Sequence, residues 1–108
     1  MAKAEIFAGI CGFNTTVKAS QNGDGVELDI HSDCQAIQKL ADQLKQVDPW
    51  KEISARRSVP QTLEMGLKYC THAACPVPAG IIKAVEVEAG LALPKDVSIK
   101  LSKDDDPN

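Results

Sequence analysis

The sequence predicts a single α+β domain, in which a three-stranded antiparallel meander is followed by three helices and a C-terminal strand. Apolar and polar residues alternate in the first third of the chain and again near its end, as strands require. Between these segments, apolar residues recur every three or four positions, as in amphipathic helices. We therefore expect a sheet with a single layer of helices on one face, formed by residues 1–101, and an acidic disordered tail over residues 102–108.

The N-terminal third is predicted to form the meander. Residues 4–10 and 13–20 have strand-like composition, and Cys11-Gly12 lies between them as a turn. Residues 21–25 contain two glycines and two polar turn formers. After this turn, apolar positions alternate with polar ones as Val26, Leu28, Ile30 against Glu27, Asp29, His31. This pattern predicts a hairpin.

The first helix is expected to begin at Ser32 or Asp33, either of which is a suitable N-cap. Its apolar stripe consists of Ile37, Leu40, Ala41, Leu44 and Val47, and extends back to Cys34. The helix should end at Asp48-Pro49-Trp50, because the residue before a proline is disfavoured in the α conformation. Residues 51–58 show little pattern and are expected to be a connection with at most one short turn.

Two further helices and a strand complete the predicted fold. Pro60 suits the first turn of a helix whose apolar stripe is Leu63, Gly66, Leu67 and Cys70. The next helix should begin after Cys75, and Gly90 is suited to the position just beyond its end. Its inner face is expected to be Val77, Ile81, Ala84, Val85 and Ala89. The last strand is predicted from the alternation of Val97, Ile99 and Leu101.

Composition and charge argue against several classes of function. Twelve basic and fifteen acidic side chains give a net charge of −3, so no basic face wide enough for a phosphate backbone is expected. No apolar run reaches the length of about 20 residues that a membrane span needs. Glu5 interrupts the short apolar stretch near the N-terminus, which favours a strand over a secretion signal. We expect a cytoplasmic protein that binds neither nucleic acid nor a membrane.

Four cysteines are the main chemical feature of the chain. Cys11, Cys34, Cys70 and Cys75 all fall at predicted ends of helices or strands, where loops can bring side chains together. In the reducing cytoplasm such cysteines favour metal binding or thiol chemistry over structural disulfides. Cys34 and Cys75 would lie near helix N-termini, which favour the thiolate form that binds metals. We therefore predict one metal site with these four ligands.

An iron–sulfur cluster is the preferred occupant of this site. A closed zinc site usually has two short ligand pairs, whereas this chain has only Cys70-x4-Cys75, and both this spacing and the Cys75-Pro76 step occur in iron–sulfur loops. Gly12 and Gly80 would let backbone N–H groups approach the cluster, and His72 would lie beside it. The expected role is electron transfer or cluster handling with a redox or cluster-transfer protein as partner.

Three alternatives remain open from the sequence. The site could hold structural zinc. Cys34 and Cys70 complete apolar stripes, so the chain could also be a metal-free interaction module with cysteines in its core. A thiol-based redox protein is the third alternative, and an enzyme using an activated Cys75 thiolate belongs with it, although Cys-x-x-Cys is absent.

The chain also resembles a known group of proteins. The step Cys11-Gly12-Phe13, the lone Cys34 and the stretch from Cys70 to Pro78 are similar to an uncharacterised family of small four-cysteine proteins from anaerobic prokaryotes. The resemblance extends over nearly the whole chain, down to Ile99. It implies no known activity, and an anaerobic setting would slightly favour the iron–sulfur cluster.

Overall fold

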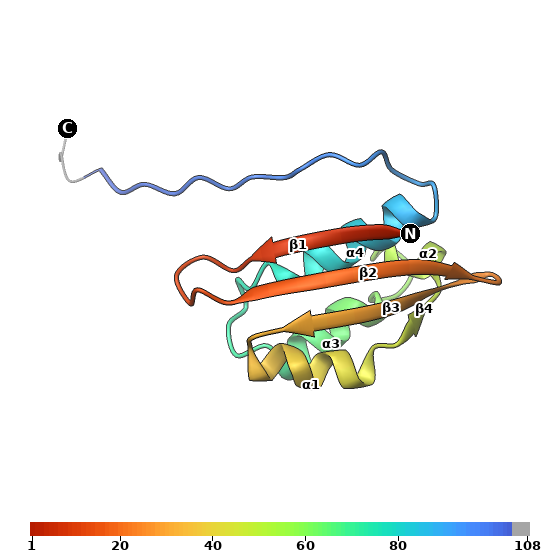
Figure 1. Cartoon of the computed structure of the whole chain (residues 1–108), viewed down its shortest axis with the longest axis horizontal. Helices are drawn as coiled ribbons and strands as arrows, with labels where there is room; N and C mark the ends of the chain where they lie inside the picture. Colours follow the sequence, from red (N-terminus) through yellow and green to blue (C-terminus); the bar gives the residue numbers. More distant parts are fainter. Residues whose placement is uncertain (105–108) are drawn as a thin grey trace.

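The fold consists of one antiparallel sheet with helices on one of its faces (Figure 1). The computed structural model describes residues 1–104. Its strands lie in the order β1 (Ala2–Phe7), β2 (Asn14–Asn22), β3 (Gly25–Ser32) and β4 (Gln46–Val47). Its helices are α1 (Gln35–Gln43), α2 (Pro49–Glu52), α3 (Gln61–Tyr69) and α4 (Val77–Glu88). The predicted α+β class is confirmed, with a sheet that has one strand more than the predicted meander.

The register of the sheet separates an apolar face from a polar one. Ala4, Val17 and Ile30 lie directly opposite one another on β1, β2 and β3, and they point toward the core. The neighbouring row, Glu5, Thr16 and His31, lies on the other face. The core is formed by the apolar face together with the helices, and its fully buried side chains include Val17, Val26, Ile37, Leu40, Leu44, Val77, Ile81 and Val85.

Two glycines allow the helices to lie close to their neighbours. A β-carbon at Gly80 would overlap the Ile6 side chain, so this glycine lets α4 lie directly on β1. A β-carbon at Gly66 would lie 2.8 Å from Cγ of Pro78, which brings α3 close to α4. α4 thus covers β1 and β2, α1 covers β3, and α3 packs between α1 and α4.

The predicted first helix is too long by one turn. α1 ends at Gln43 because Leu44 adopts φ −118° and ψ 82°, outside the helical region. The chain then extends so that Val47 pairs with Val26 in β4. Both Leu44 and Val47 are buried, as the apolar stripe predicted, but a strand rather than a helix buries Val47. Burial was therefore predicted correctly while the secondary structure was wrong.

Asp48-Pro49 begins a helix instead of ending one. Pro49 opens the single-turn helix α2, and an Asp48 carboxylate oxygen accepts a hydrogen bond from the Trp50 N–H at 3.0 Å. Pro is well suited to the first helical position because the missing N–H would have no partner there. The two later helices lie where the sequence predicts them, since α3 follows Pro60 and Gly90, with φ +75°, lies just after α4. The predicted apolar stripe of α3 was wrong at Leu67, which is 81% exposed.

The predicted C-terminal strand is absent from the described residues. Residues 91–104 run on from α4 without pairing to the sheet, and Val97, Ile99 and Leu101 are exposed. An alternating sequence becomes a strand only when its backbone pairs with a neighbouring strand, and this segment pairs with none among the described residues. Residues 102–104 are exposed and belong to no helix or strand, while residues 105–108 of the predicted acidic tail lie outside the described residues. In the part of the chain that the structure describes, no helix is long and apolar enough to cross a membrane.

Candidate metal centre

Three connections that carry the cysteines lie at the same end of the sheet. They are the β1–β2 loop, the β3–α1 junction and the α3–α4 loop, all opposite the β2–β3 hairpin (Figure 1). Cys11 lies in the first connection, Cys34 is the N-cap of α1, Cys70 is the C-cap of α3, and Cys75 directly precedes the N-cap of α4. The prediction that the cysteines lie at the ends of elements is therefore correct for Cys34, Cys70 and Cys75, whereas Cys11 lies within the loop between two strands. We call this region the thiol end.

Three of the four thiols interact with one another. Burial and the neighbouring thiols raise the pKa of Cys70 from its ordinary value of 9.0 to about 11. The largest cause is burial, followed by the charge and hydrogen bond of Cys75 and then the charge of Cys34. All three side chains are half-buried and pack against the rim of the core. Without a cation beside it, the Cys70 thiol is held in its neutral form.

A hydrogen-bond network fixes the start of α1 beside the β1–β2 loop. The Cys34 N–H donates to Oγ of Ser32 at 3.1 Å, and that hydroxyl also hydrogen-bonds Oγ1 of Thr15 at 2.8 Å. The Asp33 N–H donates to the Asn14 carbonyl at 3.1 Å. The predicted N-cap, Ser32 or Asp33, is thus wrong by one or two residues. Ser32 acts by supporting the Cys34 backbone, not by capping the helix.

Neither α1 nor α4 has a side-chain cap at its start. The N-cap residues are Cys34 and Pro76, and neither side chain accepts a hydrogen bond from the first turn. The first N–H groups of a helix have no intrahelical partner and give its N-terminus a partial positive charge. Cys34 and Cys75 therefore lie beside two helix starts that would stabilise thiolates.

Cys11 differs from the other three cysteines because it is exposed. Its loop is closed by hydrogen bonds from the Gly12 N–H to the Gly9 carbonyl at 2.9 Å and from the Ala8 N–H to the Phe13 carbonyl at 3.0 Å. Gly12 adopts φ +74°, which a residue with a side chain rarely does. Within residues 1–104, no three His, Cys, Asp or Glu side chains are placed as a group that could hold a metal ion. The fold brings the thiols to one end of the sheet, but within the described residues it does not gather three of them as a group that could hold a metal ion.

The other predicted site residues have local structural roles. The Gly80 N–H donates within α4 to the Pro76 carbonyl at 3.0 Å, and its open side faces Ile6, so this glycine serves helix packing. The Gly12 N–H is used in its own loop. His72 is exposed, and its carbonyl accepts from the Cys75 N–H at 3.2 Å, which shapes the loop between Cys70 and Cys75.

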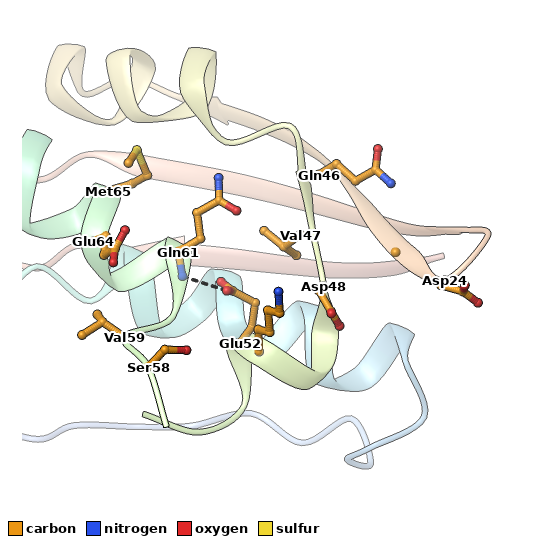
Figure 2. A pocket seen from close by; sticks show the side chains of 12 residues that line it. Asp24, Gln46, Val47, Asp48, Glu52, Ser58, Val59, Gln61, Glu64 and Met65 are labelled. Atoms are coloured by element: carbon orange, nitrogen blue, oxygen red, sulfur yellow. Dashed lines mark hydrogen bonds between the residues drawn. The ribbon is translucent and has the colours of Figure 1, made fainter. Parts of the chain in front are cut away.

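A buried carboxylate at the other end of the molecule was missed in the sequence. Glu52 is 3% exposed and accepts a hydrogen bond from the Gln61 N–H at 2.8 Å (Figure 2). It also accepts from the Thr62 N–H at 2.9 Å and from the Thr62 hydroxyl. It therefore caps α3 from outside that helix. A hollow of about 750 Å³ opens beside it, but the Asp48 and Glu52 carboxylates on its wall are engaged in capping. No periodic signal marks Glu52, because its partners follow nine and ten residues later.

Comparison with known proteins places the chain in a family. The sequence pattern of a family of unknown function, DUF6951, matches residues 2–101, and the chain belongs to that family. The predicted membership of an uncharacterised family is thus confirmed. No curated protein and no solved structure matches the chain. The match includes all four cysteines and the exposed segment after α4 up to Leu101.

Proposed function

We propose that this member of the DUF6951 family is a small cytoplasmic protein that binds an iron–sulfur cluster for electron transfer or cluster handling. The proposed ligands are Cys11, Cys34, Cys70 and Cys75. The observation that carries the proposal is the mutual interaction of the Cys34, Cys70 and Cys75 thiols, two of which lie beside helix starts without side-chain caps.

The electrostatics of the three thiols support a cationic occupant. Adjacent thiolates repel one another, which is part of the reason that the pKa of Cys70 is raised. A bound metal reverses this effect, because a coordinating thiol loses its proton. The partial positive charges at the starts of α1 and α4 act in the same direction. A bound metal would therefore favour the thiolate form of Cys70 at the thiol end.

The distribution of the thiols supports a cluster over a single zinc ion. One zinc ion holds its four ligands about 2.3 Å from a common centre. A cluster spreads its ligands over several irons, so its thiolates stand farther apart. Cys11, on the exposed β1–β2 loop, is separate from the group formed by Cys34, Cys70 and Cys75.

Exposed apolar side chains near Cys11 support the proposed protein partner. Phe7, Ile10 and Phe13, on and beside the β1–β2 loop, are all exposed to solvent. Apolar side chains grouped in this way are typical of protein interaction sites. A redox or cluster-transfer partner that docks on them would reach the cluster at its least buried ligand. The proposal involves neither nucleic acid nor a membrane.

Reconstitution of the full chain with iron and sulfide under anaerobic conditions tests the proposal. We expect a coloured protein with absorbance near about 400 nm and bound iron and sulfide. Cys34→Ser, Cys70→Ser and Cys75→Ser should each abolish this absorbance, and Cys11→Ser should shorten the lifetime of the cluster. His31→Ala is the matched control, because His31 is exposed and pairs with Asp29 on the polar face; it should leave the spectrum unchanged.

Two outcomes contradict the cluster. Folded protein that stays colourless and free of metal after reconstitution would refute metal binding and leave the interaction module with core cysteines. Protein that binds one equivalent of zinc through the same cysteines, but no sulfide, would replace the cluster by the structural zinc site.

A second candidate function rests on the hydrogen bond between the Cys70 and Cys75 thiols. Two adjacent thiols can form a disulfide when an oxidant such as oxidised glutathione accepts their two electrons and two protons. Mass spectrometry after treatment with oxidised glutathione would detect a Cys70–Cys75 disulfide that dithiothreitol reverses. A redox function requires this disulfide in the wild-type chain and its absence in Cys75→Ser.

A further inference from the structure

The segment after α4 leaves large apolar side chains in water. Leu93 is 88% exposed, Val97 63%, Ile99 75% and Leu101 91%. From residue 96 onward these side chains alternate with Asp96, Ser98 and Lys100. Such alternation is typical of a strand with one buried face, and exposing it has a cost because burial of apolar surface stabilises a fold. The segment thus has the sequence of a strand without a sheet to join.

The same molecule has a free sheet edge. β1 is the outermost strand and, within residues 1–104, pairs only with β2, so one side of its backbone has no neighbouring strand there. On the inner face of the sheet, Ala4 and Ile6 of β1 are only partly buried, whereas Val17 and Ala19 of β2 are fully buried. A further strand beside β1 would cover these side chains. An open edge of this length is a template for pairing with another chain.

We propose that residues 97–101 of one copy pair with β1 of a second copy, and that the exchange is reciprocal in a two-fold symmetric dimer. Each sheet then gains a fifth strand, and Val97, Ile99 and Leu101 extend its inner face beyond Ala4 and Ile6. Addition of a strand to an edge uses backbone hydrogen bonds for affinity and alternate side chains for specificity. Exchange of identical segments is a low-cost route to a dimer.

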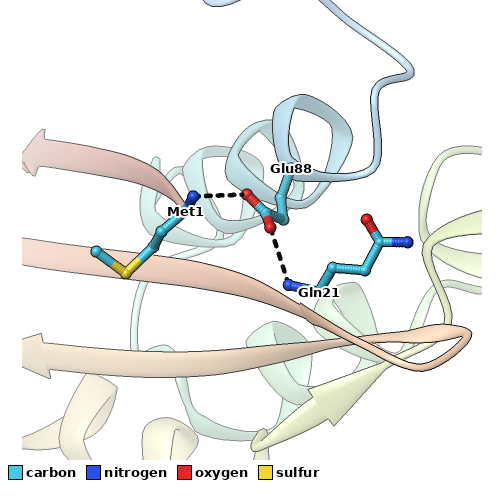
Figure 3. Close-up of polar contacts among 3 residues, drawn as sticks. All are labelled: Met1, Gln21 and Glu88. Atoms are coloured by element: carbon cyan, nitrogen blue, oxygen red, sulfur yellow. Dashed lines mark hydrogen bonds and ion pairs between the residues drawn. The ribbon is translucent and has the colours of Figure 1, made fainter.

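The direction of the segment after α4 favours pairing with β1 of a second copy over pairing with β1 of its own chain. Glu88, at the end of α4, lies 3.4 Å from the Met1 amino group, so the segment starts beside the first residue of β1 (Figure 3). It then runs in the same direction as β1 and past the end of that strand (Figure 1). Pairing within one chain would therefore be parallel, whereas every pair in this sheet is antiparallel.

The extended shape of the chain and the residue range of the family match both agree with exchange of the segment after α4 between two copies. The molecule measures 55 × 28 × 27 Å, and the segment after α4 accounts for the excess length along the first axis. An arm of this kind can reach a neighbouring copy. The family match ends at residue 101, which is also where the apolar alternation ends. The alternating segment therefore lies within the residues that the family pattern matches.

Sedimentation velocity of the full chain over a concentration series, with reducing agent present, tests this proposal. The reducing agent removes dimers linked through Cys11. We expect a monomer–dimer equilibrium in which the amides of residues 97–101 are protected from hydrogen exchange. Ile99→Lys should weaken the dimer at least about tenfold and remove this protection. Ser98→Lys is the matched control on the opposite side of the segment and should leave both unchanged.

Each other outcome overturns the proposal. A monomer with protected amides in residues 97–101 would show that the segment docks on its own chain. A monomer without protection would show that it docks nowhere. A dimer that survives both Ile99→Lys and removal of residues 95–108 would be formed by another surface. Circular dichroism checks that the variants keep the fold, which is expected because Ile99 is outside the core.

Discussion

The helices of this protein begin in two different ways at the two ends of the sheet. The starts of α2 and α3 are capped by carboxylates. Asp48 accepts a backbone N–H hydrogen bond from the first turn of α2, and Glu52 accepts such bonds from the first turn of α3. α1 and α4 begin beside Cys34 and Cys75 and have no side-chain cap. We call the region of Asp48, Glu52 and Glu88 the carboxylate end, after these three side chains (Figures 2 and 3). It lies at the opposite end of the sheet from the thiol end (Figure 1).

The two kinds of helix start serve different purposes: the carboxylate caps stabilise the fold, whereas the cysteines are the chemically reactive side chains. At the carboxylate end, anions that belong to the chain itself satisfy the helix starts, so this end is complete without a ligand. At the thiol end no carboxylate caps the starts of α1 and α4, and the raised pKa of Cys70 keeps that thiol protonated. That end acquires its anions only when the thiols ionise, which a bound metal would bring about. Substitutions at the two ends should therefore affect different properties.

The largest effect on stability is expected at Glu52. Glu52→Gln keeps the size of the side chain but leaves a single acceptor oxygen for the N–H groups of Gln61 and Thr62 and for the Thr62 hydroxyl. Loss of hydrogen bonds to a buried charged group should lower the free energy of unfolding by about 2 kcal/mol. Urea denaturation measures this loss. Glu27→Gln, at an exposed position of β3, is the control and should change stability by less than about 0.5 kcal/mol.

Some helices and strands of this protein could be predicted from the sequence, and others could not. The β2–β3 hairpin, α3 and α4 were predictable because their signals are local, such as the turn before Gly25 and the proline before Gln61. The location of three of the four cysteines at the ends of elements followed from the same periods. The end of α1 was not predictable, because pairing of Val47 with Val26 depends on a strand twenty residues earlier in the chain.

Contacts between distant residues account for the other errors. The Glu52 cap joins residues nine and ten positions apart with no period to mark it. The group of Cys34, Cys70 and Cys75 depends on how α1, α3 and α4 pack, and so does the separate place of Cys11. The strand predicted from the alternation of Val97, Ile99 and Leu101 was wrong, because a strand also needs a partner.

At the thiol end, the Cys70 thiol should make the free energy of unfolding depend on pH. In the metal-free protein the pKa of Cys70 is about 11, against 9.0 ordinarily, so the unfolded chain loses this proton first. Stability from the neutral thiol is fully present below pH 9 and is lost as the pH rises toward 11. The loss should be less than about 1 kcal/mol because solvent reaches the half-buried thiol.

Urea denaturation of metal-free protein between these pH values, compared with Cys70→Ala, measures this effect. The wild type should lose more stability than the variant over the interval. Equal slopes for the two proteins would show that the Cys70 thiol is not held neutral by its surroundings. In that case the thiol end would lack the electrostatic property that distinguishes it from the carboxylate end.

The smallest effect is expected at Glu88, on the surface of the carboxylate end. Its carboxylate accepts from the Gln21 N–H at 2.9 Å and lies 3.4 Å from the Met1 amino group (Figure 3). The hydrogen bond from Gln21 is the main reason that the pKa of Glu88 is lowered from 4.5, and burial opposes the shift. A lowered pKa stabilises the fold above pH 4.5, and this contribution is lost as the pH falls through the folded value.

Glu88→Gln should therefore lower the free energy of unfolding by about 0.5 kcal/mol at pH 7, as is usual for surface ion pairs. At pH 3 the difference from the wild type should be smaller, because protonation of Glu88 removes the same charge there. Urea denaturation at the two pH values measures both quantities. An equal loss at both would mean that Glu88 acts through its shape and not its charge. The carboxylates that stabilise this end by their charge would then be the helix caps Asp48 and Glu52.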